Sequence, residues 1–476
     1  MMRDPLFFLF LFIPCWTHAQ HCGEKIHMSG CDKPHSVKNP DFIEKYGPFA
    51  AGEKFYFFES VALNLGKERK LFAYEYDKGT ERCMRAVEMP LILIEGQGHV
   101  EDVIHMDNSL VVIHHTYTKK EERVTLYAQA FSVEDLSPIS EPVVISKDEL
   151  TNTSHGPLEV DVRTNSANDA FMLAFKTDNI DQHGYTVMCY VFNERLELEW
   201  RTWKGLAKRH PSGRLYNEVY LLDDGSVYFE ALAWNGKLNK TVEESTELKL
   251  VRLHRDERTE WDRKLPKGGL LGGVGLLQEG GRNKVGGFLM NETRGGRISE
   301  WRIIELDSAL QPTVIAKGRL KGSGFSDVKY SSLRTDPLGG YFLIGTLDEA
   351  LVVLSIDAKG KVRWEKSMRS KLPRLPYAFV TGTGLHLAMM AHASDVRSLN
   401  SGKGFENAGF QQQPLLLTFD AKGALSVEEM IAAKEGGTRD VIDYGYPDFG
   451  LMQRYNAFLD ISHDKKRPGL VRVPLN

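Results

Sequence analysis

Short apolar runs separated by turn residues dominate the chain. Each run is too short to form a helix before the next turn residue follows. In the clearest stretch, apolar runs occupy residues 340–346 and 351–356, and a mixed run follows at 361–367. A short segment at 326–330 precedes them. Runs of this length, bounded by glycine and aspartate, predict β-strands. The four segments together predict one four-stranded sheet.

The same order of segments returns along most of the chain. Looser copies centre near Leu71, Leu126, Cys189, Leu250, Ile303, Leu416 and Val471, at intervals of about 50 to 64 residues. A period of this length, with several strands per unit, is typical of a β-propeller. We therefore predict an all-β protein, a β-propeller of four-stranded blades. Counting a truncated last copy favours eight blades, and merging that copy with the first leaves seven.

The turn between the third and fourth strands carries its own pattern. Residues 357–360 read Asp-Ala-Lys-Gly, and residues 420–423 repeat these four letters. The aspartate supplies a side-chain acceptor and the glycine supplies a positive φ, which favours a hairpin. Residues 192–196 and 306–310 have no such glycine, so we expect the third and fifth copies to lack this turn.

The last copy, at residues 450–461 and 469–473, stops after its third strand. A ring must pair its first and last blades to remove the free sheet edges. The missing strand is expected from the segment near Glu24 to Met28, or from a rearranged closure of the first copy.

Three tryptophans occupy the fourth strand of their copies, at Trp200, Trp261 and Trp364. A glycine–aromatic strand, an acidic turn and a tryptophan in this order resemble the repeats of secreted bacterial propellers. The layout is similar to that of pyrroloquinoline-quinone-type repeat propellers. This resemblance implies the fold and does not imply the quinone cofactor.

The first 19 residues read as a signal peptide. Arg3 precedes an apolar core at residues 6–13, and a small residue, Ala19, stands before Gln20. We expect three parts: the signal peptide at 1–19, a cysteine-containing segment at 20–45 and the propeller at 46–476. No transmembrane segment is expected, since no other apolar run reaches about 18 residues. The protein is expected to be secreted or periplasmic.

Composition excludes some partners. The chain has 42% hydrophobic and 26% charged residues and a formal net charge of −4. A general nucleic-acid binder carries a basic excess or stripe, which is missing here. Four cysteines remain after the predicted signal peptide, and Cys22 and Cys31 are close enough to form a small disulfide loop in an oxidising compartment. Cys83 and Cys189 both lie in strand-like contexts. The alternative for these two cysteines is that they are simply small buried hydrophobes.

Acidic residues recur at the start of the innermost strands, where a propeller brings its blades together. They are Glu101, Glu159, Glu218, Asp327 and Asp440. Converging carboxylates would form a negative funnel that could hold a cation, with calcium the nearest candidate. Alternatively, each acid accepts backbone hydrogen bonds from the neighbouring blade and serves the repeat itself. We predict no other cofactor and no dedicated metal ligands.

Basic and aromatic residues lie on the same segments. His99, Arg214, Tyr216 and Arg439 are neighbours of these acids in sequence. Arginine and aromatic side chains are what carboxylate or sugar ligands require. His114 and His115 are adjacent within one strand, so we expect their rings to point to opposite faces and one to lie in the core.

The leading functional hypothesis is an exported propeller that acts as a non-catalytic binding or assembly scaffold at the cell envelope. Its ligand would be a protein or a carbohydrate at one propeller face. The alternative is a propeller enzyme, a glycosidase or lyase, that uses the acids and arginines of the channel mouth. Quinone- or metal-dependent oxidation is a third possibility. No nucleophile elbow, zinc-protease motif or dinucleotide fingerprint occurs.

Overall fold

The structure is a computed structural model of the chain. It describes residues 26–27, 42–63, 68–80, 82–91, 97–118, 123–147, 160–181, 184–207, 216–234, 246–262, 264–265, 269–279, 281–291, 297–321, 325–326, 328–369, 377–392, 398–399, 412–429, 457–462 and 469–474. No helix among these residues is long and apolar enough to cross a membrane.

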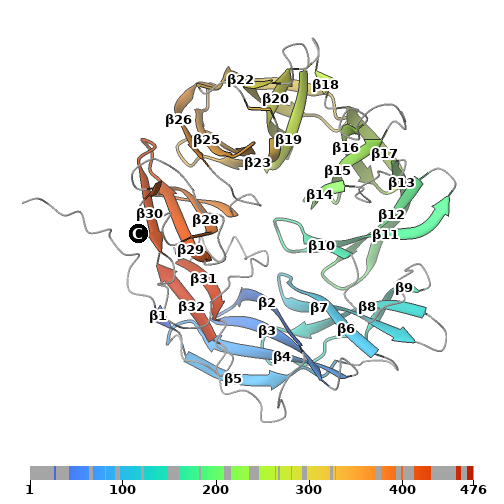
Figure 1. Ribbon diagram of the computed structural model, residues 1–476. Coiled ribbons are helices and arrows are strands. Elements are labelled where there is room, and N and C mark those ends of the chain that lie inside the picture. Colours follow the sequence, from blue (N-terminus) through green and yellow to red (C-terminus); the bar gives the residue numbers. More distant parts are fainter. Residues whose placement is uncertain are drawn as a thin grey trace, which may run out of the picture.

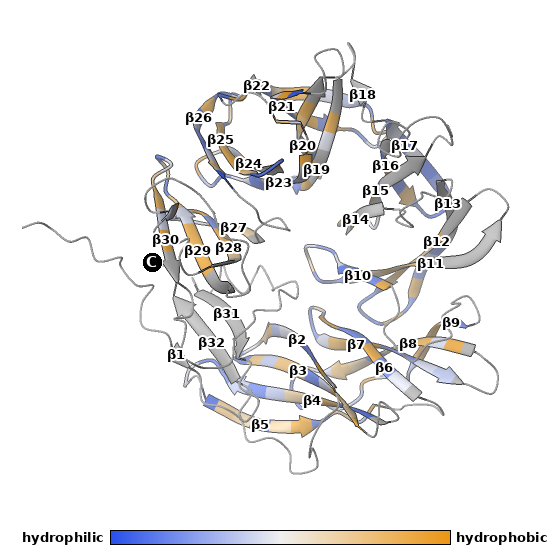
Figure 2. Ribbon diagram, viewed as in Figure 1, coloured by the Kyte–Doolittle hydropathy of each residue, from blue (hydrophilic) through white to orange (hydrophobic). Residues whose placement is uncertain are grey.

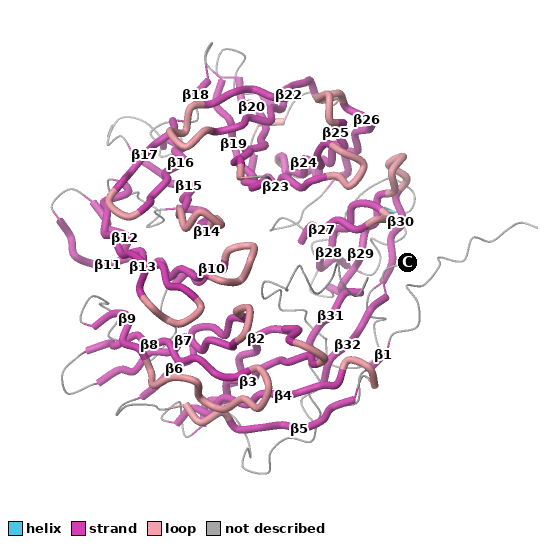
Figure 3. Tube along the Cα trace, turned by 180° about the vertical axis from the view of Figure 1, so that it is seen from behind, coloured by secondary structure: helices cyan, strands magenta, loops and turns pink. Residues whose placement is uncertain are grey.

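The described strands form a ring of antiparallel sheets, as Figure 1 shows from one side and Figure 3 from behind. The described residues form eight sheets, of which six have four strands, one has five and one has three. In each of the first seven, the chain runs through the strands in spatial order, from one edge of the sheet to the other. This is the architecture of a β-propeller and confirms the predicted fold class. The number of complete blades stays a prediction, because the last sheet has only three described strands.

The first four sheets contain β2 (Phe42–Ala51), β3 (Lys54–Leu63), β4 (Glu68–Asp77) and β5 (Arg82–Glu88); β6 (Gln97–His105), β7 (Ser109–Thr118), β8 (Arg123–Ser132) and β9 (Val143–Lys147); β10 (Val160–Thr164), β11 (Ala170–Asp181), β12 (Gly184–Asn193) and β13 (Leu198–Ala207); and β14 (Tyr216–Leu221), β15 (Val227–Trp234), β16 (Thr246–His254) and β17 (Glu257–Asp262).

The next three sheets contain β18 (Lys264–Leu265), β19 (Gly269–Glu279), β20 (Arg282–Asn291), β21 (Arg297–Leu306) and β22 (Pro312–Arg319); β23 (Val328–Thr335), β24 (Gly340–Leu347), β25 (Ala350–Asp357) and β26 (Val362–Arg369); and β27 (Tyr377–Thr381), β28 (Gly384–His392), β29 (Gln412–Phe419) and β30 (Leu425–Glu429).

The eighth sheet joins two distant parts of the chain. It contains β31 (Ala457–Ser462), β32 (Gly469–Pro474) and β1 (Ile26–His27). β1 pairs antiparallel with β32, with Ile26 opposite Arg472. The segment near Glu24 to Met28 therefore supplies the strand that the last copy lacks, and the first of the two predicted modes of closure is confirmed.

Six of the seven clusters in the described core lie between two neighbouring sheets, and the seventh, which includes Phe57 and Tyr74, is formed by the first sheet alone. Ile113 of β7 and Leu173 of β11 belong to one buried cluster, and Val353 of β25 and Leu387 of β28 belong to another. Figure 2 shows apolar residues along middle strands such as β25 and β29. Because both faces of each middle strand are covered by a neighbouring sheet, these strands are continuous apolar runs without alternation.

The tryptophans of the fourth strands pack across these same boundaries, and their predicted position is confirmed. Trp200 lies on β13 and donates a hydrogen bond from Nε1 to the carbonyl of Gly225 in the next sheet, at 3.2 Å. Trp364 lies on β26 and stacks on Phe419 of the next sheet, with ring centroids 5.6 Å apart. Each of these two rings therefore joins its own blade to the following one.

The turn between the third and fourth strands keeps the same backbone geometry in copies whose turn sequences differ. Asp357 Oδ1 accepts the backbone N–H groups of Lys359 and Lys361, and Gly360 has a φ of +78°. In the five-stranded fifth sheet the equivalent turn joins β21 and β22: Asp307 Oδ1 likewise accepts two backbone N–H groups, and the left-handed position is taken by Leu310, with a φ of +58°.

The expectation that the third and fifth copies lack this turn is therefore wrong. Leu196 has a φ of +60° in the third sheet and, like Leu310, has a buried side chain. A left-handed non-glycine residue costs roughly 1–2 kcal/mol, and full burial of a leucine side chain contributes about 1.5–3 kcal/mol. Burial of the leucine offsets the backbone cost, so glycine is not required.

The cysteines are only partly described. Cys189 is buried and carries a free thiol, in agreement with its expected place in the core. Cys83 on β5 is disulfide-bonded, and its partner lies outside the described residues, so Cys83 is not simply a small buried hydrophobe. Cys22 and Cys31 also lie outside the described residues, and their pairing stays a prediction.

We expect Gly423→Ala to destabilise the protein by more than the backbone cost alone. Gly423 has a φ of +78°, and a Cβ atom at this position would lie 2.7 Å from the ring of Trp364. The backbone cost is roughly 1–2 kcal/mol, and overpacking against the ring adds about 1–3 kcal/mol. Urea denaturation of the purified protein measures the sum.

Gly281→Ala is the matched control for this substitution. Gly281 has a φ of +73°, but no atom lies within 4 Å of the position of its Cβ atom. This variant should show the backbone cost alone. Equal losses of stability in the two variants would show that the contact between Trp364 and the next blade is not tight.

Candidate functional site

The candidate site lies where the first strands of three successive sheets meet. β6 begins the second sheet and contacts both β2 of the first sheet and β10 of the third. Figure 1 shows β2 and β10 on the inner side of the ring. Several ionisable side chains of β2 and β6 are buried at this boundary, although such side chains are rarely buried unless they are paired.

A histidine–glutamate–histidine cluster forms the centre of this region. His99 of β6 lies directly opposite His115 of β7 in the strand register, and their rings stack with centroids 5.5 Å apart. A β-bulge between Val100 and Asp102 interrupts the register next to Glu101. Glu101 Oε1 lies 2.5 Å from His115 Nδ1 and 3.3 Å from His99 Nδ1. The side chains are only 2% (His99), 4% (Glu101) and 1% (His115) exposed.

Residues of the first sheet complete the cluster from the other side. Glu44 Oε1 on β2 lies 3.2 Å from His99 Nε2. Glu44 is held in turn by Arg69 of β4, whose Nη1 donates to Glu44 Oε2 at 2.8 Å. The Tyr46 hydroxyl donates to the carbonyl of Val100 at 2.8 Å and lies 3.3 Å from Glu44 Oε2. The cluster therefore bridges the first and second sheets.

The electrostatics of the cluster reflect burial and charge together. Burial alone would lower the pKa of His99, but the adjacent carboxylates of Glu101 and Glu44 outweigh it and raise this pKa to about 9. Burial would raise the pKa of Glu101, but His115 and His99 hold it below its usual range. For Glu44, the opposing effects of burial, His99 and Arg69 likewise leave a lowered pKa.

Asp102 is the next residue on β6 and has a different environment. Its Oδ1 accepts the backbone N–H of Val103 at 2.8 Å. Burial raises the pKa of Asp102 to about 7, against the opposing effects of this hydrogen bond and of Arg163 on β10. Two adjacent carboxylates thus differ strongly in how readily they ionise, because only Glu101 faces two imidazoles.

Two imidazoles and a carboxylate in one small buried space can hold either a proton or a metal ion. An all-oxygen donor set suits calcium, whereas imidazole nitrogen suits zinc and other first-row transition metals. The ligand atoms of His99, Glu101 and His115 all lie within 4.8 Å of one another. This set differs from the carboxylate ring that the sequence predicted.

Of the eight predicted ligand-binding residues, only Glu101 has a described side chain, and it lies in the cluster. Tyr216 and Glu218 lie on β14, and the structure describes their backbone but not their side chains. The others lie outside the described residues: Glu159, Arg214, Asp327, Arg439 and Asp440. Convergence of the acids, and a calcium ion among them, therefore stay predictions.

The sequence reasoning named Glu101 and His99 but missed their partners. Glu44 and Arg69 come from another sheet, and nothing local in the sequence links them to β6. The predicted opposite orientation of His114 and His115 is confirmed, because the His114 ring stacks on Tyr127 at 5.4 Å while His115 faces His99. The combination of His99, Glu101 and a histidine on the facing strand was visible, but only the strand register pairs these residues.

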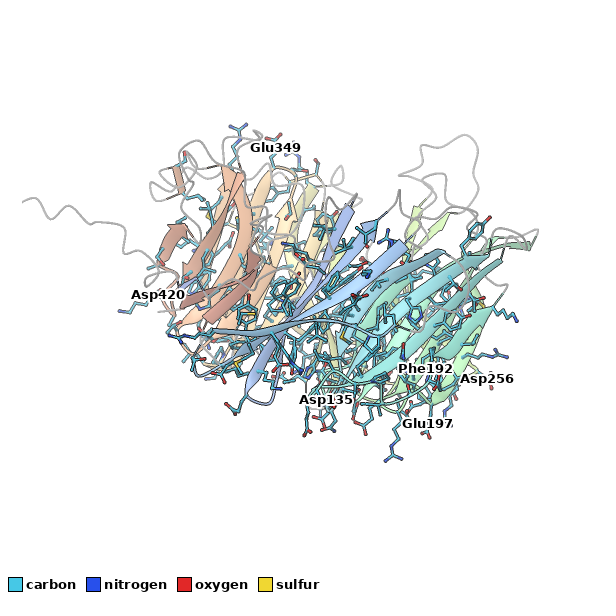
Figure 4. All side chains as sticks on the ribbon, turned by 90° about the horizontal axis from the view of Figure 1, so that it is seen from below. Asp135, Phe192, Glu197, Asp256, Glu349 and Asp420 are labelled. Atoms are coloured by element: carbon cyan, nitrogen blue, oxygen red, sulfur yellow. The ribbon has the colours of Figure 1, made fainter. Side chains whose placement is uncertain are left out.

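A second feature is an acidic cleft between the third and fourth sheets, about 510 Å³ in volume. Its acidic lining residues are Asp169, Glu194, Glu197, Glu199, Asp223 and Asp224. Figure 4 shows Glu197 on the same side of the ring as Asp135 and Asp256, and Glu349 on the opposite side. The cleft is lined by hairpin turns, and Asp223 accepts the backbone N–H of Ser166 at 3.0 Å. These acids therefore partly serve the turns themselves.

No protein-family model matches the chain, and no curated protein matches it in sequence. Among solved structures, the β-propeller domain of the Trilobed protease from Pyrococcus furiosus is 9% identical with a TM-score of 0.38, over 80% of this chain and 94% of that one. Pyrococcus horikoshii acylaminoacyl peptidase is 9% identical with a TM-score of 0.40, over 89% of this chain and 57% of that one.

A polysaccharide lyase is also similar, with 10% identity and a TM-score of 0.39, over 90% of each chain. At these identities the similarity concerns the fold and not the activity. The ring of antiparallel sheets places this protein in the class of the β-propellers, and the description of its site depends on its own residues.

His386 on β28 is a contrasting buried histidine. Its Nε2 lies 2.7 Å from the Thr381 hydroxyl oxygen, and its Nδ1 lies 2.9 Å from the Thr418 hydroxyl oxygen. Burial lowers the pKa of His386 to about 4. Hydroxyl groups thus leave a buried histidine neutral at pH 7, whereas the carboxylates around His99 favour its charged form.

We expect His386 to make the protein less stable in acid. His386 takes up a proton near pH 6.5 in the unfolded chain and only near pH 4 in the folded chain. Its contribution to the free energy of unfolding is therefore fully present above pH 6.5 and is lost as the pH falls to 4. The loss over this range is on the order of 2–3 kcal/mol. Denaturant unfolding at pH 7.0 and pH 4.5 measures it.

The His386→Asn variant removes the titrating group and keeps a polar side chain. It should be less stable at pH 7, since the threonine hydrogen bonds change, but should lose less stability between pH 7.0 and pH 4.5 than the unsubstituted protein. An unchanged pH dependence would show that His386 is not the group that titrates.

Proposed function

We propose that this protein is an exported β-propeller that binds a ligand at the inner rim of the ring and performs no catalysis of its own. The observation that supports this function best is the mixed charge of the partly exposed side chains around the buried cluster. Glu44 is 20% exposed, and on the inner strand of the third sheet Arg163 is 23% and Asp161 33% exposed. Glu44 on β2 and the Arg163–Asp161 pair on β10 thus lie on the two inner strands that contact β6 from either side.

Burial favours binding over catalysis at this site. His99, Glu101 and His115 have the chemistry of an acid–base or metal centre, but their side chains are at most 4% exposed. A catalytic group must come within hydrogen-bond reach of the atom on which it acts. A polymeric substrate cannot reach these side chains in this conformation, whereas a ligand can contact the rim around them.

Carbohydrate is the ligand class that fits the rim best. Carboxylates accept hydrogen bonds from sugar hydroxyls, and arginine donates several in a fixed geometry. The two signs of charge are interleaved, so the rim does not select strongly for an anion or a cation. We therefore favour carbohydrate over a protein ligand at this face of the propeller.

Location at the cell envelope is part of the proposal and rests on the sequence of the first 19 residues. Expression of the full chain in a secreting host should yield protein outside the cytoplasm that begins at Gln20. Amino-terminal sequencing of the exported protein checks this, and an intact first residue in a cytoplasmic fraction would argue against export.

We expect the purified protein to bind at least one member of a panel of soluble polysaccharides, measured by affinity electrophoresis and calorimetry. Arg163→Ala should weaken that binding roughly tenfold or more, because a hydrogen bond to a charged group contributes about 1.5–3 kcal/mol. Arg282→Ala is the matched control, since Arg282 lies on β20 of the fifth sheet with a side chain 70% exposed.

Two results would reject this function. If no polysaccharide binds, or if both arginine variants bind equally well, the rim is not a carbohydrate site. If a bound polysaccharide is shortened during incubation, with new reducing or unsaturated ends, the alternative of a glycosidase or lyase replaces the scaffold. Chain length is measured by size-exclusion chromatography of the polysaccharide after incubation.

A further inference from the structure

We propose that His99, Glu101 and His115 bind a first-row divalent metal ion, for which zinc is the natural probe, at the boundary between the first two sheets. This inference is independent of the ligand proposed for the rim. It depends on four observations: the donor set, the spacing of the donor atoms, the carboxylate behind His99, and the lack of hydrogen bonds to three of the four imidazole nitrogens.

The donor set is two imidazole nitrogens and one carboxylate oxygen. Three protein ligands of this kind hold zinc in sites that keep a fourth position for water or another ligand. The same set is poor for calcium and magnesium, which require oxygen ligands. Of the described residues, these three meet the geometric requirement for a shared ion, with all ligand atoms within 4.8 Å of one another.

The spacing also fits a bound ion. Zinc bonds to nitrogen and oxygen are about 2.0–2.2 Å long, so in a tetrahedral site neighbouring ligand atoms lie about 3.3–3.5 Å apart. His99 Nδ1 and Glu101 Oε1 are 3.3 Å apart. His115 Nδ1 and Glu101 Oε1 are 2.5 Å apart, which is a hydrogen-bond distance. A rotation of the Glu101 carboxylate that opens this contact by about 1 Å brings Glu101 to this spacing from both histidines, and the two histidine ligand atoms lie within 4.8 Å of each other.

A carboxylate lies behind His99, on the side away from the other two donors. Metal-binding histidines usually donate their second ring N–H to a carboxylate, which fixes the tautomer and the ring orientation. Glu44 Oε1 lies 3.2 Å from His99 Nε2, and Arg69 holds Glu44 in place. With Nε2 directed to Glu44, the lone pair of His99 Nδ1 is left for the ion.

Three of the four imidazole nitrogens of His99 and His115 lack hydrogen bonds that would otherwise explain their burial, and the fourth, His115 Nδ1, contacts Glu101. Neither ring nitrogen of His99 makes a well-aligned hydrogen bond, and His115 Nε2 has no partner. A buried polar atom without a partner costs roughly 1–3 kcal/mol. A metal ion bound to His99 Nδ1 removes one of these costs directly and aligns the contact between His99 Nε2 and Glu44.

A proton on His99 is the competing occupant of the cluster. The positive charge of a protonated His99 would offset the charge of the Glu44 and Glu101 carboxylates, as Arg69 already does in part, without a bound metal ion. The two occupants differ in stoichiometry and spectrum: a metal site takes up one ion per chain with a defined coordination geometry, whereas a protonated histidine takes up none.

The test uses the full mature protein without an affinity tag, treated with a chelator and dialysed. Titration with Zn²⁺ in a calorimeter, in the presence of a competing weak chelator, should give one equivalent bound per chain. Co²⁺ should give the intense visible absorption of a tetrahedral site with nitrogen and oxygen ligands. Ca²⁺ and Mg²⁺ should not displace either ion.

Substitutions separate this site from binding at surface histidines. His99→Ala and His115→Ala should abolish the one-equivalent site, and Glu44→Gln should weaken it roughly 10- to 100-fold without changing the stoichiometry. His114→Gln is the matched control, because His114 is adjacent, equally buried and on the opposite face of β7. This variant should keep the site.

Absence of the Zn²⁺ and Co²⁺ signals in the folded, unsubstituted protein would overturn the proposal and leave the proton as the occupant. Equal loss of binding in His114→Gln would do the same. If the alanine variants fail to fold, Glu44→Gln decides the question: a folded variant with unchanged affinity would exclude the carboxylate-backed site. Loss of carbohydrate binding by Arg163→Ala has no bearing on this result.

Discussion

The packing of each sheet between two neighbours is the constraint on which the rest of the molecule depends. The middle strands are apolar on both faces, so a single sheet could not be stable in water. Six boundaries between the described sheets each bury one shared cluster, and the tryptophans of β13 and β26 pack beneath the turns of the next sheet. A row of such sheets would leave two uncovered faces, and the pairing of β1 with β32 brings the two ends of the chain into one sheet.

The same packing places charged residues where water is excluded. The first strands β2 and β10 lie on the inner side of the ring and both contact β6, so charged side chains of β2 and β6 meet at the boundary of the first two sheets. Burial of a charge is costly unless it is paired. At the boundary of the first two sheets, Glu101 is paired with two histidines and Glu44 with His99 and Arg69. The shifted pKa values of His99 and Asp102 follow from how completely each group is paired. They indicate the boundary at which side chains can hold a proton or a metal ion.

Particular residues show how far sequence reasoning reached. The turn at residues 357–360 was predictable because aspartate and glycine each have a conformational role there. The equivalent turns that end in Leu196 and Leu310 were missed. The backbone cost of a leucine at a left-handed position is offset only by burial of its side chain, which no local pattern shows. Glu101 was predicted from its place at the start of an inner strand. Glu44 and Arg69 could not be predicted, because they reach the cluster from a different sheet.

The sequence by itself determined the strands, their order within each sheet and the repeat that builds a ring, because these depend on local apolar runs and turn residues. It also placed the tryptophans on the fourth strands. Only the tertiary structure decided which side chains share a boundary: that His99 faces His115, that Glu44 lies behind His99, and that the segment at Ile26–His27 completes the last sheet. These contacts join residues far apart in sequence or on facing strands, and their register is set by the packing of whole sheets and not by any local pattern.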